Sequence, residues 1–142
     1  NSPIDFKKLV IETVPHWTVQ LHEDQSYLGR IVIALTRPAE VDFLDLSEDE
    51  HAAYFKVARR CKQALCELFA PDMFNHASLR NEWRQQHVHL VPRYQTPRNF
   101  GEREFVDARW GRNWAPNEKL LLPEAELLQI HATIQARLLL TP

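Results

Sequence analysis

Two histidines and a glutamine alternate within one short stretch of the chain, Gln85-Gln86-His87-Val88-His89-Leu90-Val91-Pro92-Arg93. In a β-strand successive side chains point to opposite faces, so Gln85, His87 and His89 are expected on one face. Same-face neighbours lie roughly 6.5–7 Å apart, because each residue advances a strand by about 3.3 Å. A neutral imidazole is nucleophilic at physiological pH. The stretch therefore predicts two imidazoles and an amide in a row that can line a phosphate-sized ligand.

The same spacing admits two other interpretations. His-x-His on one strand face is a common geometry for metal ligands. Glu82 is the only carboxylate near the pair, and no Cys or Asp lies between residues 77 and 99. Alternatively, both histidines are structural and form hydrogen bonds on a half-exposed face of a sheet. We expect neither a bound metal ion nor another cofactor.

Composition excludes several classes of protein. A chain of 142 residues, 44% apolar and 25% charged, is typical of a single soluble globular domain. Its net charge of −2 gives no support for nucleic-acid binding, which requires a basic face. No apolar run approaches the roughly 20 residues that span a bilayer, so we expect no membrane association. Cys61 and Cys66 diverge on a helix, which favours reduced thiols and a cytoplasmic protein.

Periodicity predicts the elements that position the histidines. Alternating apolar residues indicate strands at residues 16–22, 30–36, 73–79 and 104–108, in addition to the histidine strand that ends at Arg93. Helical spacing indicates helices at residues 47–69 and 123–140. Ser47 and Glu50 form a capping box at the start of the first helix. Residues 4–15 are an N-terminal extension of uncertain structure.

The histidine stretch resembles the signature of the histidine triad (HIT) superfamily, which is His-x-His-x-His, two apolar residues and often Pro-Arg. Gln85 replaces the first histidine, and the other positions fit. Three more segments resemble parts of the family: residues 29–38 its Gly-His apolar strand, residues 44–47 the entry to its long helix, and residues 75–81 the approach to the triad in bacterial members. The similarity covers residues 16–93 of a single domain, 1–142, in which residues 94–142 form a C-terminal loop and helix.

This resemblance implies an α+β fold with about five antiparallel strands and two main helices, paired as a homodimer. It also implies a hydrolase or nucleotidyl transferase, similar to bacterial diadenosine polyphosphate hydrolases. Its substrate would be a purine nucleotide conjugate, either a dinucleoside polyphosphate or a nucleoside phosphoramidate. His87, at the middle triad position, would attack the α-phosphate and form a covalent nucleotidyl-histidine that water then cleaves. His89 would contact the phosphate oxygens or protonate the leaving group.

The resemblance also assigns roles outside the two histidines. Gln85 would orient the nucleophile as a neutral amide. The residues expected to contact phosphate are Asn81, Asn75 and Arg30. The residues expected to bind the ribose are Asp24 and His22. A base pocket could be formed by Ile4, Phe6 and Leu9, which could instead pack in the core. The site could be covered by Trp110 and Trp114, which could instead pack in a dimer contact.

Three positions depart from the family pattern. Gln85 carries an amide, which cannot become charged. Arg30 stands where the family has a second auxiliary histidine. Glu82 places a carboxylate where Ser or Thr often contacts the α-phosphate. An alternative interpretation is therefore a nucleotide-binding protein with little or no catalysis.

Overall fold

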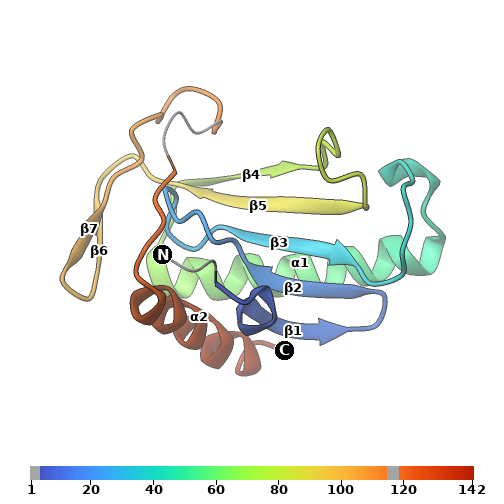
Figure 1. Ribbon diagram of the computed structural model, residues 1–142, viewed down its shortest axis with the longest axis horizontal. Coiled ribbons are helices and arrows are strands. Elements are labelled where there is room, and N and C mark those ends of the chain that lie inside the picture. Colours follow the sequence, from blue (N-terminus) through green and yellow to red (C-terminus); the bar gives the residue numbers. More distant parts are fainter. Residues whose placement is uncertain (1–3, 115–118) are drawn as a thin grey trace.

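The computed structural model describes residues 4–114 and 119–142. Five strands form one antiparallel sheet in the order β1-β2-β3-β5-β4, as Figure 1 shows. The strands are β1 Val10–Val14, β2 Trp17–Leu21, β3 Ile31–Leu35, β4 Met73–Ala77 and β5 His87–Arg93. With two α-helices beside this sheet, the predicted α+β fold is confirmed.

The strands predicted at residues 16–22 and 30–36 are present as β2 and β3, which pair antiparallel. Trp17 pairs with Leu35 and Leu21 pairs with Ile31, and every residue of β3 is buried. The N-terminal segment, which the sequence left undefined, forms a 3₁₀ turn, η1 (Phe6–Leu9), and then the edge strand β1. The sheet therefore begins before the first strand that alternation indicated.

Helix α1 (Glu48–Phe69) begins at the predicted capping box. Glu50 N donates to Ser47 Oγ at 3.1 Å, and Ser47 N donates to the Glu50 carboxylate at 3.0 Å. Two of the unpaired amides at the helix start are thereby satisfied. Helix α2 (Glu124–Leu139) follows Pro123 and lies within a residue of its predicted bounds.

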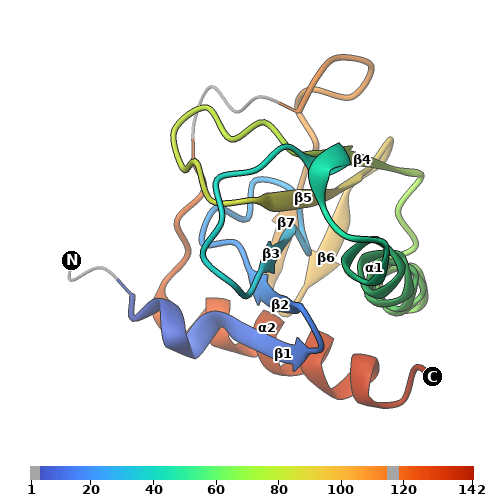
Figure 2. The same ribbon diagram turned by 90° about the vertical axis from the view of Figure 1, so that its right-hand side faces the viewer.

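The sheet has two chemically different faces. α1 covers one face, and α2 lies beside α1 along β1 (Figures 1 and 2). In β5, Val88 and Leu90 pair with Ile33 and Ile31 and belong to the hydrophobic core. His87 and His89 alternate with them and therefore point away from α1. The helices on one face thus leave the other face free for a site.

The strand predicted at residues 104–108 was wrong in its extent. Strand β7 covers Arg103–Phe105 and pairs with β6 (Arg98–Phe100), which the sequence did not indicate. The two form a separate hairpin, and Gly101 adopts φ +60° in its turn. β7 ends before Asp107, whose carboxylate binds Arg93 of β5 and draws the chain toward the main sheet.

Two further features bear on the sequence predictions. Cys61 and Cys66 are both free thiols, as their spacing on the helix predicts. Across residues 4–114 and 119–142, none of the helices combines the length and the apolar content that crossing a membrane requires.

Candidate functional site

A cleft of about 830 Å³ lies over the sheet face that carries the histidines. Its walls come from the ends of β2 and β3, from β5, and from the turn at residues 79–83. Six of the residues predicted from the sequence line it: His22, Asp24, Arg30, Asn81, His87 and His89. The fold therefore gathers residues that are up to 67 positions apart into one cavity.

His87 is held in one tautomer. Its side chain is 5% exposed, and its Nδ1 lies 2.7 Å from the carbonyl oxygen of Gln85. A carbonyl only accepts hydrogen bonds, so Nδ1 carries the proton and Nε2 keeps its lone pair. The Trp83 ring lies against the imidazole, with 4.5 Å between ring centroids and 35° between the ring planes. In the neutral ring, His87 therefore presents the lone pair of Nε2 as a nucleophile.

His89 is held in the opposite tautomer. Arg30 Nη2 lies 3.4 Å from His89 Nδ1, and a guanidinium only donates hydrogen bonds. The proton of His89 is therefore on Nε2. Burial and the positive charge of Arg30 lower the pKa of His89 to about 3. At neutral pH His89 is accordingly an uncharged hydrogen-bond donor and not a cationic acid.

His22 is the third imidazole of the cleft. The backbone amide of Asp24 donates to His22 Nδ1 at 3.0 Å, which places the ring proton on Nε2. The His22 and His89 rings are 5.8 Å apart between centroids. Burial and the positive charge of Arg30 lower the pKa of His22 to about 4. This ring is also neutral at pH 7.

Asp24 and Arg30 form a buried pair at the base of the cleft. Asp24 is 1% exposed, and its Oδ1 accepts from Ser26 N, Ser26 Oγ and Leu120 N. Its Oδ2 lies 3.5 Å from Arg30 Nη1. Burial alone raises the pKa of Asp24, but these hydrogen bonds and Arg30 outweigh it and lower the pKa. The carboxylate is therefore anionic; three hydrogen bonds occupy its Oδ1, whereas its buried Oδ2 has no hydrogen-bond partner among the described residues.

Arg30 occupies the space that the sequence assigned to phosphate binding, but most of its contacts are internal. Only 4% of Arg30 is exposed, and its guanidinium lies 4.8 Å from the centroid of the Trp114 ring. Trp114 also packs against His89, with 5.3 Å between centroids. Arg30 therefore acts first on His89, whose Nδ1 it holds.

Gln85 does not lie in the predicted row beside the two histidines. Its Oε1 accepts from Ala39 N at 2.7 Å, and its Nε2 donates to Leu35 O and Arg37 O at 2.8 and 2.7 Å. Strand β5 begins only at His87, so the Gln85 side chain turns to the loop after β3. Gln85 contacts the nucleophile through its backbone carbonyl alone.

The two predicted asparagines are in different places. Asn81 lies in the exposed turn that borders the cleft. Asn75 is outside the cleft, where its Oδ1 accepts from Arg93 Nη1 at 2.7 Å. Arg93 also binds Asp107 at 2.7 Å, so Asn75 belongs to the contacts that anchor the loop after β7.

Several residues at the cleft had no role in the sequence prediction. Trp83 packs against His87 and is itself 48% exposed. The sequence feature that could have pointed to this role is a tryptophan within a polar turn. Lys119 also borders the cleft. Of the three apolar residues considered for the base, Phe6 lines the cleft, whereas Leu9 is buried in the core and Ile4 packs against it.

The described residues contain no group of three or more His, Cys, Asp or Glu side chains arranged to hold a metal ion. The cleft contains three imidazoles, those of His22, His87 and His89. Among them, His87 presents a lone pair at Nε2, while His22 and His89 present N–H donors. Such a set can attack an electrophilic centre and bind its oxygens.

Comparison with known proteins places the chain in a family. Residues 7–96, well over half of the sequence, match the model of the HIT domain. None of the curated proteins compared with the chain matches it.

Solved structures share the fold over almost the whole chain. A histidine triad protein from Bradyrhizobium japonicum is 25% identical with a TM-score of 0.75, covering 91% of this chain and 89% of its own. A histidine triad protein from Marinobacter aquaeolei is 20% identical with a TM-score of 0.75, covering 94% and 90%. One from Sinorhizobium meliloti is 20% identical with a TM-score of 0.72, covering 94% and 89%. The chain belongs to the histidine triad family.

Proposed function

We propose that this protein cleaves or transfers a nucleoside monophosphate from a purine nucleotide conjugate, in the manner of a diadenosine polyphosphate hydrolase. The observation that carries the proposal is the arrangement of two adjacent imidazoles in the cleft. His87 presents an unprotonated Nε2, and His89, 5.0 Å away between ring centroids, presents a protonated one. A nucleophile and a hydrogen-bond donor are thus set side by side.

In the first step, His87 Nε2 attacks the α-phosphorus and forms an N–P bond as the bond to the leaving group breaks. The His89 N–H donates to a phosphate oxygen, where negative charge accumulates. The imidazole of the adduct is positively charged, and the face of the Trp83 ring stabilises that charge. Water then breaks the N–P bond and releases the nucleoside monophosphate.

The neutral state of His89 bears on the choice of substrate. A polyphosphate leaves as a stable anion, whereas an amine requires a proton to leave. Because the pKa of His89 is lowered to about 3, this residue is a weak source of that proton at pH 7. We therefore favour dinucleoside polyphosphates over nucleoside phosphoramidates as substrates.

The test is rapid-quench trapping with radiolabelled diadenosine polyphosphate and, separately, with an adenosine phosphoramidate. The expected result is a labelled adduct on His87 that is absent from His87→Ala. A His76→Ala variant, which changes a histidine outside the cleft, serves as the matched control. Absence of both turnover and adduct in the wild-type protein would refute the catalytic proposal.

The alternative is a nucleotide-binding protein with little catalysis. The observation that favours it is Gln85, whose side chain is bound to three backbone groups and does not replace the missing imidazole. Calorimetry with AMP separates the two functions. Binding without turnover supports the alternative, and absence of binding argues against both.

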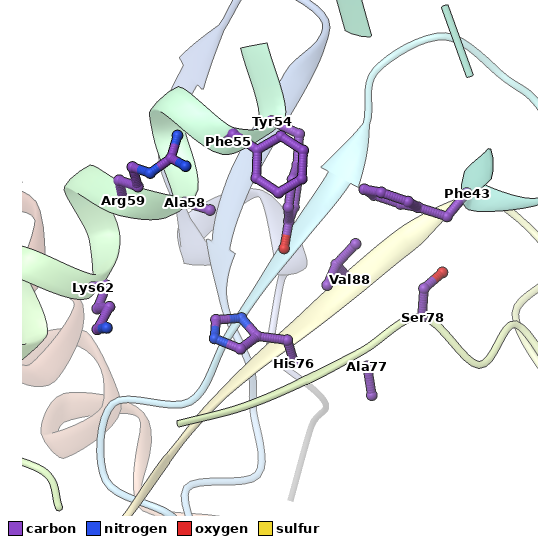
Figure 3. Close-up of a pocket in the computed structure, with 10 residues that line it drawn as sticks. All are labelled: Phe43, Tyr54, Phe55, Ala58, Arg59, Lys62, His76, Ala77, Ser78 and Val88. Atoms are coloured by element: carbon purple, nitrogen blue, oxygen red, sulfur yellow. The ribbon is translucent and has the colours of Figure 1, made fainter. Parts of the chain in front are cut away.

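We also propose that two copies pair along β4. This strand is the last in the sheet, so its outer edge has no neighbouring strand within the described chain. Beside it lies an apolar groove of about 520 Å³ between α1 and β4, which Figure 3 shows. Phe55 and Met73 are 45% and 51% exposed at this edge. A second copy would extend the sheet and cover this surface.

The proposed location is the cytoplasm. Its support is chemical: the structure contains two free thiols, Cys61 and Cys66, of which Cys66 is exposed. An exposed thiol persists in a reducing compartment. Fractionation of cells that express the natural protein would test this location.

A further inference from the structure

We infer that Arg93 is a positioning residue: it fixes the loop at residues 107–114, and this loop holds Trp114 against Arg30 and His89. The role concerns the reaction proposed above and rests on the proposed function. Arg93 lies on the same strand as His89, β5, four residues later. Residues an even number of positions apart share a strand face, so both side chains point to the side that carries the cleft.

All five N–H groups of the Arg93 guanidinium donate within the protein. Nε and Nη2 donate to the Asp107 carboxylate at 2.7 and 3.1 Å, and Nη1 donates to Asn75 Oδ1 at 2.7 Å. The remaining two donate to the carbonyl oxygens of Arg109 and Arg112 at 2.8 and 3.0 Å. Only 2% of Arg93 is exposed. A guanidinium has five N–H donors and no acceptor, so Arg93 has none left for a substrate and acts only through these partners.

The partners of Arg93 fix the short loop that leads to Trp114. Asp107 Oδ1 also accepts from Arg109 N at 3.0 Å, and Arg109 O accepts from Arg112 N at 2.8 Å. The Arg109 side chain donates to the backbone carbonyl of Asn113 at 2.7 Å and to its side-chain oxygen. Trp114 follows Asn113 directly. The backbone that presents the Trp114 ring is therefore fixed on β5.

Trp114 supplies a contact that the Arg30 guanidinium otherwise lacks. Its polar contacts are long, 3.4 Å from Nη2 to His89 Nδ1 and 3.5 Å from Nη1 to Asp24 Oδ2. Arg30 Nε is buried without a hydrogen-bond partner among the described residues. The Trp114 ring lies against both groups, with its centroid 4.8 Å from Arg30 Cζ and 5.3 Å from the centroid of the His89 ring. The face of the ring attracts the cation, and the exclusion of water strengthens the contact with His89.

The orientation of His89 consequently depends on residues that do not contact a substrate. If the loop moves, Trp114 no longer holds the Arg30 guanidinium at His89 Nδ1. The imidazole can then change its tautomer or rotate, and its N–H is no longer directed to a phosphate oxygen. A misplacement of about 1 Å in a catalytic group can slow a reaction by about a hundredfold. Arg93 thus affects the rate although its own donors are all used within the protein.

Rapid-quench kinetics with radiolabelled diadenosine polyphosphate tests this role. We expect Arg93→Lys and Trp114→Ala each to slow formation of the histidine adduct by about tenfold or more, because both release the orientation of His89. Trp114→Phe keeps an aromatic face and should retain most of the rate. The affinity for adenosine, measured by calorimetry, should not change in any of these variants.

Arg103→Lys is the matched control. Arg103 also binds a carboxylate through Nε and Nη2, that of Glu126 on α2, with both distances 3.0 Å. Neither residue lines the cleft. The same change of arginine to lysine should therefore leave adduct formation at the wild-type rate.

Several results would overturn the inference. One is a wild-type rate in an Arg93→Lys protein that is folded by circular dichroism. Another is a wild-type rate in Trp114→Ala, which decides the question if Arg93→Lys does not fold. Trp114→Phe as slow as Trp114→Ala would also contradict it, since the aromatic face is the proposed contact. A parallel loss of adenosine affinity would contradict a role that acts through His89 alone.

A measurement without substrate separates this inference from the proposed function. In ¹⁵N-labelled protein, the chemical shifts of the ring nitrogens of a histidine identify its tautomer. We expect only the Nε2–H form at His89 in the wild type and a mixture of both forms in Arg93→Lys and Trp114→Ala. Unchanged His89 shifts in both variants would refute the inference. If the shifts change as expected but the wild type forms no adduct, the proposed function fails and the positioning of His89 stands.

Discussion

Strand β5 separates two cavities of different chemistry. On one side is the cleft of about 830 Å³, which contains His87 and His89. On the other is the groove of about 520 Å³, where Val88 lies among aromatic side chains of α1 and the loop before it. Consecutive residues of a single strand thus serve a polar site and an apolar surface.

The difference lies in how polar groups are satisfied. In the cleft, backbone and guanidinium partners occupy the Nδ1 atoms of three histidines, and only their Nε2 atoms remain for a ligand. In the groove, the exposed surface is mainly carbon, which gains free energy when another apolar surface covers it. The cleft is therefore suited to chemistry and the groove to association.

The largest expected effect on stability distinguishes the two faces of β5. Leu90 is fully buried, so Leu90→Ala should lower the free energy of unfolding by about 2–5 kcal/mol. His89→Ala removes one long hydrogen bond and should cost about 1 kcal/mol or less, while it weakens AMP binding. Urea denaturation measures both variants. Equal losses would mean that the histidine face also supports the core.

The pH dependence of stability should reflect the protonation of the two cleft histidines with lowered pKa values. The pKa values of His22 and His89 fall from 6.5 in the unfolded chain to about 4 and about 3 in the folded protein. The unfolded state therefore binds more protons below pH 6.5, and stability decreases as pH falls. We expect a loss of about 4 kcal/mol between pH 6.5 and 4.5, about 2 kcal/mol from each histidine, since the slope approaches about 1.4 kcal/mol per pH unit for each group only well below pH 6.5.

Between pH 6.5 and 4.5 the pH dependence of stability contains little contribution from Glu50, the carboxylate with the largest pKa shift. The pKa of Glu50 is lowered from 4.5 to about 2 by its hydrogen bonds with Arg37 and Ser47, so Glu50 contributes to the pH dependence only below pH 4.5. A double variant, His22→Gln with His89→Gln, should flatten the profile between pH 6.5 and 4.5. A profile as steep as that of the wild type would show that other groups cause the loss.

A charge introduced in the groove should weaken self-association without changing nucleotide binding in the cleft. Phe55→Glu places a carboxylate on the proposed contact and should weaken self-association by about 30-fold, the effect of losing a central interface residue. AMP affinity should not change. Leu139→Glu, at an exposed apolar residue of α2, is the matched control. Sedimentation that is identical for both variants would contradict pairing through this groove.

The smallest expected effect on turnover concerns the missing triad histidine. Gln85→His removes three hydrogen bonds to the loop after β3, and an imidazole cannot form all of them. We expect a loss of about 1–2 kcal/mol in stability and no gain in turnover. Kinetics with a dinucleoside polyphosphate would check this. A faster variant would mean that the absent imidazole limits the wild-type rate.

Features that depend on neighbours along the chain were predictable. Alternation in β5 placed His87 and His89 opposite Val88 and Leu90, and the structure shows this division. The capping box of Ser47 and Glu50 located the start of α1. Each depends on local periodicity or on a contact between residues three apart, which the sequence displays directly.

Features that depend on loops were less predictable. Asn75 was expected at the phosphate, but Arg93 holds it outside the cleft, since the loop after β7 returns to this part of β4 and β5. The strand predicted at residues 104–108 ended early because Asp107 binds the same arginine. Neither contact leaves a pattern in the sequence, as the partners lie 14 and 18 residues apart.

The sequence by itself determined the class of fold, the strand that carries the chemistry, and the side of that strand on which His87 and His89 lie. Only the tertiary structure decided which groups surround them. It turned Gln85 toward a loop, buried Asp24 and brought His22 beside His89. The physical reason is that periodicity specifies the face of an element, whereas lateral neighbours depend on strand register and on the course of the loops.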